Sequence, residues 1–244
     1  MGRSLPHTAR REKCRRVSNA LYQPRELCGQ GLVLRPWDDG LVREMAAWGA
    51  HGFPYHAFDL TYLRDRFRAQ LTLRKMQEAG PHLHFVAMEG GRAVARASVN
   101  PDDAAGVYLW SVHVPPEFEG NGLCRRMLAT IMTWLESEVP GRPFVLTSNS
   151  FASHAHRAYA ALGFSITETR WHFDVDVARE LWKASEEVRQ TLTGHTRFVN
   201  GRWEVRAHVF SRRPGTPMEL LSAPRPVEQH GRDLIGRSGP VRTA

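Results

Sequence analysis

Apolar residues recur in a regular pattern only from about residue 30 onward. Residues 32–37 predict a first strand, and Asp38 follows at the position of a helix N-cap, with a short helix after it that reaches Trp48. A longer helix is expected over 61–78, because apolar residues recur there at helical spacing. The face predicted to be buried carries Leu63, Phe67 and Leu71.

The middle of the chain predicts strands joined by tight turns. Residues 82–89 and 92–99 alternate between apolar and polar positions, and they flank Gly90-Gly91. Glycine accepts the positive φ angles of a two-residue hairpin turn, so these two strands are expected to pair. A second turn, rich in Asp and Pro, leads into a further strand over 107–114.

The remaining elements alternate between helix and strand. Five apolar residues at helical spacing predict a helix over 123–138. The elements expected after it are a strand over 144–147, a helix over 153–162 closed by Gly163, one or two strands within 164–177, a helix over 178–192 and a hairpin turning at Asn200-Gly201. This order predicts an α/β or α+β fold, with helices packed on a mixed sheet.

The same pattern divides the chain into four parts. Residues 1–29 are expected to form a basic, disordered tail, and residues 30–177 the core. Residues 178–211 are expected to add a helix and a hairpin packed on that core. Residues 212–244, rich in Pro, Gly and Arg, are expected to form a second disordered tail.

Composition narrows the class of protein. Of 244 residues, 42% are hydrophobic and 24% are charged, which is ordinary for a globular protein. The net charge of +8 lies largely in the two tails, so solvated termini are favoured over a nucleic-acid surface. No apolar run approaches the ~18 residues of a membrane span, and no secretory signal begins the sequence, so a cytoplasmic location is expected. The cysteines, Cys14, Cys28 and Cys124, show neither metal spacing nor a disulfide framework.

One turn stands out for its chemistry. Residues 112–126 join a hydrophobic strand to an amphipathic helix through Gly120 and Gly122. The first amides of a helix have no partner within it, and glycine lets the backbone approach a phosphate without an intervening Cβ. The turn lacks the lysine of a Walker loop and the third glycine of a dinucleotide fingerprint. From these residues alone it is either an anion cradle or a plain helix cap.

A resemblance to a known family extends this interpretation. The stretch from Val112 to Leu128 resembles the cofactor-binding motif of the GNAT acyltransferase superfamily, whose pattern is Arg or Gln, two residues, Gly, one residue, and Gly or Ala. Those positions hold Glu119, Gly122 and Cys124. A second family motif, A-x-x-L-Y-x-x-x-G-F, is matched downstream by Ala155, Tyr159, Gly163 and Phe164. Together the motifs and the strands around them cover roughly residues 31 to 175.

The resemblance implies a GNAT-type sheet, mixed but mostly antiparallel and flanked by helices, with a C-terminal helix and hairpin extension. It implies acetyl-CoA, or another acyl-CoA, as the acyl donor. The backbone of Val112, His113 and Val114 would pair with the pantetheine arm, and Tyr159 would act as general acid on the leaving thiolate. The pyrophosphate would lie on the loop formed by Gly120, Asn121, Gly122, Leu123, Cys124 and Arg125.

The sequence also departs from the family. Glu119 stands where the family has a basic or amide residue, and Ala152 stands where an Asn is often found. Thr147 occupies a strand position at which the family can place a catalytic Glu. His113, which can titrate near neutrality, is the candidate base, and its alternative role is that of a structural hydrogen-bonding residue.

The acceptor side is expected at the aromatic loop that follows Trp48. Phe53, Tyr55 and His56 are the candidate substrate-binding residues, and the same aromatic side chains equally suit a loop pinned to the core. Two His-x-His pairs occur, at residues 82–84 and 154–156, but neither has an evident third ligand. No metal is therefore expected.

Three functions follow from these observations. The first is an N-acetyltransferase that moves an acetyl group from acetyl-CoA to a primary amine by direct attack, with a small-molecule acceptor favoured over a protein. The second is a GNAT-fold module that binds an acyl-CoA with little or no turnover. The third, a nucleic-acid-associated protein, is disfavoured because aromatic residues do not alternate with the basic clusters. No membrane partner is expected, and a homodimer is left open.

Overall fold

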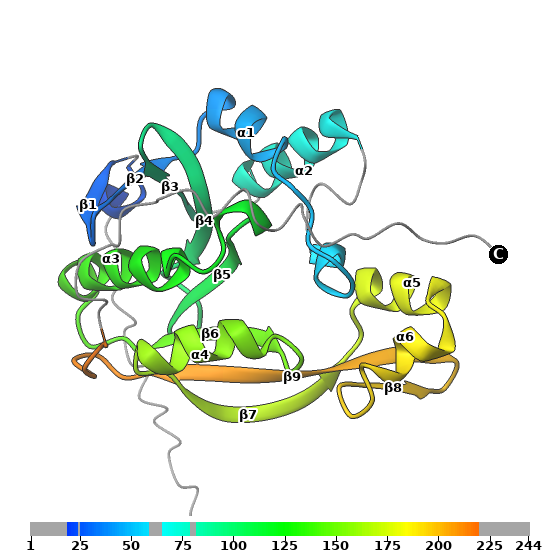
Figure 1. Ribbon diagram of the computed structural model, residues 1–244. Helices are drawn as coiled ribbons and strands as arrows, with labels where there is room; N and C mark the ends of the chain where they lie inside the picture. Colours follow the sequence, from blue (N-terminus) through cyan, green and yellow to red (C-terminus); the bar gives the residue numbers. More distant parts are fainter. Residues whose placement is uncertain (1–18, 24, 59–64, 79–81, 220–244) are drawn as a thin grey trace, which may run out of the picture.

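The computed structural model describes residues 19–23, 25–58, 65–78 and 82–219, and in these a single sheet runs through the molecule (Figure 1). The strands are β1 Leu27–Gly29, β2 Leu32–Pro36, β3 Leu83–Glu89, β4 Arg92–Asn100, β5 Val107–His113, β6 Phe144–Asn149, β7 Ser165–His172, β8 Thr196–Val199 and β9 Arg202–Arg212. The helices are α1 Asp39–Met45, α2 Arg66–Glu78, α3 Leu123–Glu138, α4 Ser153–Ala161, α5 Val175–Lys183 and α6 Glu186–Gln190. Short 3₁₀ turns are η1 Asn19–Tyr22, η2 Tyr55–Phe58 and η4 Pro116–Phe118.

The sheet has nine strands in the order β1-β2-β3-β4-β5-β6-β9-β7, with β8 paired to β9. Neighbouring strands are antiparallel except β5 and β6, which are parallel. The prediction of a mixed, mostly antiparallel sheet flanked by helices is therefore confirmed. In the described part of the chain, no helix combines the length and the apolar character needed to cross a membrane.

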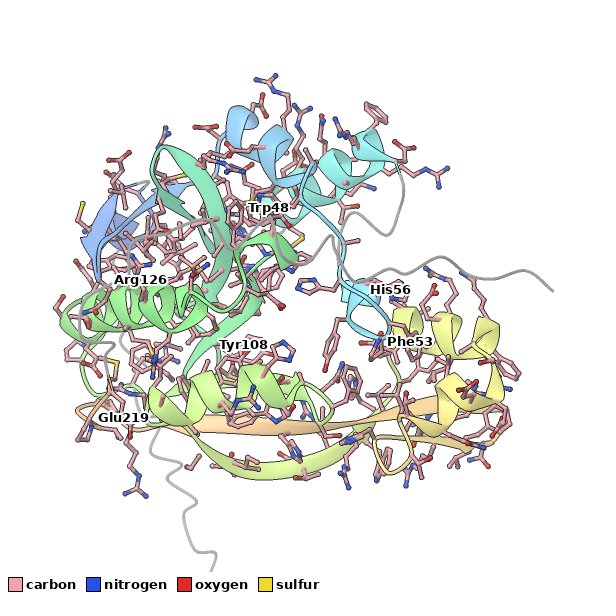
Figure 2. The ribbon with its side chains drawn as sticks, viewed as in Figure 1. Trp48, Phe53, His56, Tyr108, Arg126 and Glu219 are labelled. Atoms are coloured by element: carbon pink, nitrogen blue, oxygen red, sulfur yellow. The ribbon has the colours of Figure 1, made fainter. Side chains whose placement is uncertain are left out.

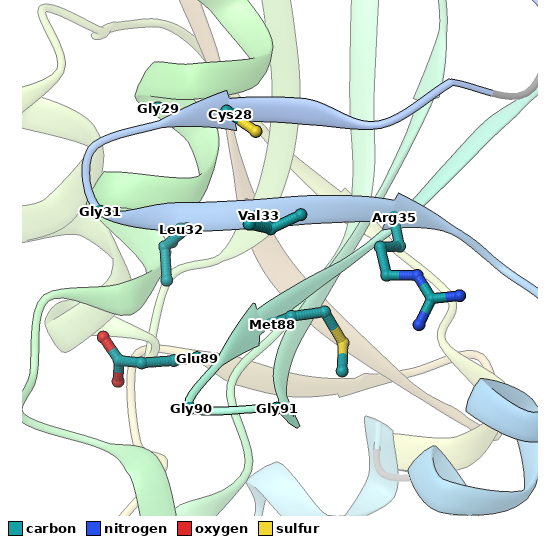
Figure 3. A pocket seen from close by; sticks show the side chains of 10 residues that line it. All are labelled: Cys28, Gly29, Gly31, Leu32, Val33, Arg35, Met88, Glu89, Gly90 and Gly91. Carbon is teal, nitrogen blue, oxygen red and sulfur yellow. The ribbon is translucent and has the colours of Figure 1, made fainter.

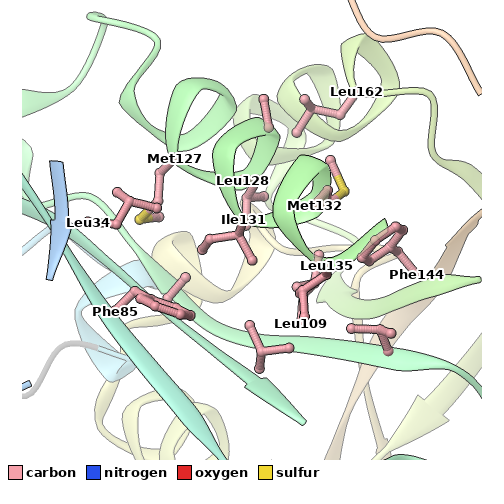
Figure 4. Close-up of a cluster of buried hydrophobic side chains, with 14 of the residues drawn as sticks. Leu34, Phe85, Leu109, Met127, Leu128, Ile131, Met132, Leu135, Phe144 and Leu162 are labelled. Atoms are coloured by element: carbon pink, nitrogen blue, oxygen red, sulfur yellow. The ribbon is translucent and has the colours of Figure 1, made fainter. Parts of the chain in front are cut away.

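Alternate side chains of the central strands pack into two separate hydrophobic cores, one on each face of the sheet. Phe85 and Ala87 of β3 belong to the core under α3 and α4, whereas Val86 between them belongs to the core under α1 and α2. Figure 4 shows the larger core, in which one face of α3 meets the sheet. The α3 residues buried there recur at helical spacing, as predicted: Leu123, Met127, Leu128, Ile131 and Leu135.

Local signals in the sequence predicted several boundaries correctly. The Asp38 side chain accepts a hydrogen bond from the Leu41 amide at 2.8 Å and caps α1. Asn200 and Gly201 have φ angles of 50° and 77°, as the β8–β9 hairpin requires. The prediction for α2 was wrong about its buried face: Ala69 and Leu73 are buried, while Phe67 is 67% exposed. Residues 59–64, including Leu63, lie outside the described part.

The C-terminal region differs from its prediction. Only one strand, β7, lies within 164–177, and α5 already begins at Val175. The helix expected over 178–192 is two helices, because Ala184 is extended and Ser185 caps α6. The hairpin does not lie on top of a finished core: β9 pairs with β6 on one side and β7 on the other, so it is an interior strand of the sheet.

Parts of both expected tails are also ordered. β1 pairs with β2, and Leu21 is only 2% exposed, so the prediction of disorder over 1–29 was wrong for this segment. At the other end, Arg212 is buried and forms an ion pair with Glu136 at 2.6 Å. Its guanidinium also donates to the carbonyls of Leu162 and Thr216. Residues 1–18 and 220–244 lie outside the described part.

Candidate functional site

The candidate site begins where two parallel strands part. β5 and β6 pair only at Val107 with Phe144 and at Tyr108 with Val145. Beyond Tyr108 the two strands are no longer paired, so backbone groups of β5 that would continue the ladder have no partner in β6. Exposed strand edges of this kind can accept an extended chain through main-chain hydrogen bonds. A ligand arm with amide groups therefore fits this edge of β5.

A β-bulge in β5 sets the direction of the side chains at this opening. Arg96 pairs with His113 and Ser98 with Trp110, so Ser111 and Val112 together stand opposite a single β4 residue. Ser111 has a φ of 51°, and its hydroxyl accepts a hydrogen bond from Arg96. The extra residue shifts by one position the alternation of β5 side chains between the two faces of the sheet.

The three predicted pantetheine residues are split by this bulge. Val112 and Val114 pack towards the core under α3. His113 points to the opposite face, where its ring stacks on Trp48 with centroids 5.6 Å apart. The backbone of these residues thus lies at the edge of β5 beyond its pairing with β6. The valine side chains contact the core under α3, and the His113 side chain contacts Trp48 on the other face.

The loop after β5 delivers the N-terminus of α3 beside the opening. Gly120 and Gly122 have φ angles of 83° and 66°, which glycine adopts without strain. A Cβ at Gly120 would meet nothing within 4 Å, so the backbone is open there. Gly122 is the N-cap and offers no side-chain cap, and the first amide to bond within α3 is that of Arg126. The preceding helical amides are therefore unpaired within the helix and suit an anion.

The other predicted loop residues have distinct environments. Asn121 donates through Nδ2 to the carbonyls of Phe118 and Glu119, at 3.3 and 3.4 Å, and so braces the loop. Leu123 is buried, and Arg125 is half-buried on the first turn.

Arg126, the next residue of α3, anchors the helix to the sheet (Figure 2). It is 4% exposed and donates to the carbonyls of Gln30 and Gly31. It also forms an ion pair with Glu89 at 2.8 Å. Its charge therefore anchors the start of α3 to the β1–β2 turn and to the β3–β4 hairpin.

Tyr159 and Cys124 bring the two sequence motifs together. Tyr159 on α4 is buried and packs edge-on against Phe210 with ring centroids 5.5 Å apart. Burial, and then the nearby Cys124 thiol, raise the pKa of Tyr159 well above its usual value, so its hydroxyl stays protonated. Burial also raises the pKa of the Cys124 thiol to about 12, so this thiol is a packing group and not a nucleophile at neutral pH.

The opposite side of β5 carries a group of imidazoles and carboxylates. His51 meets the His113 ring edge-on, with centroids 5.3 Å apart. His51 Nε2 lies 3.1 Å from Glu119 Oε1, and the Gly49 amide donates to Glu117 Oε1 at 3.2 Å. The loop after α1 is thus fastened to the loop before α3. No local motif marks His51 in the sequence, because its partner Glu119 lies 68 residues away.

The three predicted acceptor residues lie between the start of α4 and α5. Tyr55 donates to the Phe151 carbonyl at 3.0 Å and meets His154 edge-on at 5.0 Å, so it lies at the start of α4. Burial, and then the charge of Glu119, raise the pKa of Tyr55. Phe53 and Tyr55 both pack against the hydrophobic cluster that includes residues of α5. His56 Nε2 lies 3.1 Å from Glu180 of the same helix (Figure 2).

A hollow of the described surface lies away from these residues (Figure 3). It measures about 610 Å³ and lies between the β1–β2 and β3–β4 turns, at the far end of the sheet from β6. None of the predicted site residues lines it. Among the described residues, no three His, Cys, Asp or Glu side chains are arranged to hold a metal ion. His82 and His84 pack instead against Trp110, and burial lowers the pKa of His84 to about 4.

The sequence and the fold were compared with protein families and with solved structures. The model of the acetyltransferase (GNAT) family matches residues 42–164. A GCN5-related N-acetyltransferase from Brucella melitensis is similar in structure, with 15% identity, 78% of each chain covered and a TM-score of 0.57. A spermidine N-acetyltransferase from Vibrio cholerae, solved with CoA and spermine, has 12% identity, a TM-score of 0.51, and covers 76% of this chain and 97% of that one. At such identities the likeness concerns the fold. Comparison with curated protein sequences gives no match.

Proposed function

The chain belongs to the acetyltransferase (GNAT) family, and from this premise we propose that it transfers an acetyl group from acetyl-CoA to a primary amine. The observation that carries this proposal is the parting of β5 and β6 beside the open N-terminus of α3. The opening suits the amide-bearing pantetheine arm, and the loop suits the pyrophosphate.

The donor would bind along the β5 edge. The backbone of Val112, His113 and Val114 would pair with pantetheine as an added half-strand. The amides of the loop at 120–125 would contact the pyrophosphate, favoured by the helix dipole. Because Arg126 is committed to Glu89 and to two carbonyls, the contacts to the phosphates would come mainly from the backbone, with Arg125 at the rim.

The chemistry would need one acid and one proton acceptor. Tyr159, kept protonated by its raised pKa, would donate to the thiolate that leaves when the amine attacks the thioester. The amine would approach on the face of His113 and Tyr55, opposite α3. His113 would contact the amine on that face. A small-molecule amine is proposed as acceptor, in line with the spermine bound to the Vibrio cholerae protein.

Two measurements test this function. Acetyl-CoA at about 100 times its Kd should raise the free energy of unfolding by about 2.7 kcal/mol. Mixed with acetyl-CoA and a panel of primary amines, the protein should release free CoA. Stabilisation by acetyl-CoA without CoA release from any amine would support the alternative of a binding module. Neither stabilisation nor release would contradict both.

A further inference from the structure

We propose that the His51–Glu119 pair is the proton acceptor of the reaction, with His51 taking the proton from the acceptor ammonium. This inference rests on the acetyl transfer proposed above. A primary amine is mostly protonated at neutral pH and must lose a proton before its nitrogen can attack. A base is therefore needed on the acceptor face. Thr147, at the strand position where the family can place a catalytic Glu, cannot serve as one.

The geometry of the pair is that of a histidine base with its supporting carboxylate. Nε2 of His51 lies 3.1 Å from Oε1 of Glu119. A carboxylate at this distance fixes the orientation of the ring and stabilises the imidazolium that forms when the ring takes a proton. If Nε2–H donates to Glu119, then Nδ1 is the basic nitrogen of the neutral ring.

The position of the pair relative to the donor supports the same role. His51 meets His113 edge-on, and His113 is the last residue of β5, the strand edge proposed to hold pantetheine. Glu119 immediately precedes Gly120 in the loop proposed to hold the pyrophosphate. A ring held by Glu119 is thus fixed to the same loop that fixes the donor.

The difference in exposure between the two side chains gives the proton a route to solvent. The His51 side chain is 14% exposed, whereas that of Glu119 is 47% exposed. A proton taken in the shielded part of the site can therefore leave through the carboxylate to solvent. The other titratable groups around the pair are His113, which contacts His51, Tyr55 and His154, which both feel the charge of Glu119, and Glu117 on the same loop.

The step balances in protons and electrons. His51 takes one proton from the ammonium, and the freed lone pair attacks the carbonyl carbon of the thioester. The carbon–sulfur bond breaks, and the thiolate takes a proton from Tyr159. The second amine proton, lost as the amide forms, restores the Tyr159 hydroxyl. The proton on His51 passes to solvent, so the net products are the amide, CoA and one proton.

The test compares matched variants in the CoA-release assay. His51→Gln, which still donates to Glu119, should lower kcat by about 10²-fold or more, as expected for loss of a general base. Glu119→Gln should lower kcat less and should move the acid limb of the kcat/KM profile to lower pH, because the charge that stabilises the imidazolium is gone. Glu117→Gln is the control and should match the wild type, since its amide oxygen still accepts from Gly49.

Raising the pH separates a lost base from a lost fold. As the pH nears the pKa of the amine, about 10, free amine becomes abundant and the deficit of His51→Gln should shrink. A deficit that stays constant with pH, or wild-type rates in both variants, would overturn the inference while leaving acetyl transfer intact. Loss of activity in His113→Gln with full activity in His51→Gln would assign the base to His113 instead. An inactive wild type would refute the proposed function itself.

Discussion

Replacing Arg126 by methionine tests whether the start of α3 is anchored as the structure indicates. The guanidinium donates to Gln30 at 2.8 Å, to Gly31 at 3.1 Å and to the Glu89 carboxylate at 2.8 Å. Two hydrogen bonds to carbonyls contribute about 1 kcal/mol each, and one to a charged group contributes about 1.5–3 kcal/mol. Methionine fills the volume of the stem but makes none of these bonds. We expect a loss of about 3–5 kcal/mol in the free energy of unfolding.

Denaturant unfolding measures this loss, and Arg125→Met is the matched control. Arg125 is the preceding residue of the same helical turn and is half-buried, so its replacement should change stability by no more than about 0.5 kcal/mol. For a chain of this size, the Arg126 variant should unfold about 6–20 °C lower than the wild type. A loss below about 1 kcal/mol in Arg126→Met, or equal losses in the two variants, would refute the anchoring role.

Three further predictions concern the site and its surroundings. Tyr159→Phe should lower kcat by about 10²-fold or more with little change in stability, because the ring packing is kept and only the acid is lost; unchanged turnover would remove Tyr159 from the mechanism. Gly122→Val should weaken acetyl-CoA binding in titration calorimetry and cost about 1–2 kcal/mol of stability, since valine is strained at a φ of 66°; wild-type affinity would argue against the cradle. His84 is neutral in the folded protein, with a pKa of about 4, but binds a proton below about pH 6.5 when unfolded. Stability should therefore fall as the pH drops from about 6.5 to 4, and His84→Asn should show a shallower fall in denaturation measured across that range.

The parts of the fold that the sequence predicted are those encoded by local patterns. Helical spacing defined α3, and the Asn200-Gly201 turn defined the β8–β9 hairpin, because both depend on residues close in the chain. The burial of β9 between β6 and β7 depends on pairing with residues 144–149, which no local pattern encodes. The order at Arg212 has the same origin, because its charge is accommodated by Glu136, far away in the sequence.

The candidate site also has one part that local patterns predict and one part that depends on residues distant in the sequence. Its proposed donor half is a continuous strand, loop and helix, so the spacing of Gly120 and Gly122 predicted a glycine turn at the start of a helix. The donor itself was implied only by the resemblance to the family. Its acceptor half is assembled from separate elements. Phe53, Tyr55 and His56 were expected to line it because they are aromatic and lie in the loop after Trp48. Their packing against α5 depends on residues far away in the sequence, such as Glu180.

Glu119 shows how one residue can belong to both halves. Judged along the sequence, an acid beside a phosphate loop weakens the interpretation of the motif, since like charges repel. In the folded chain, its carboxylate reaches His51 on the acceptor side, and the backbone of the loop remains available to an anion. The repulsion is reduced by this pairing, above all when His51 is protonated. The departure from the family pattern is therefore compatible with the proposed donor binding, and it places a carboxylate on the face proposed for the acceptor.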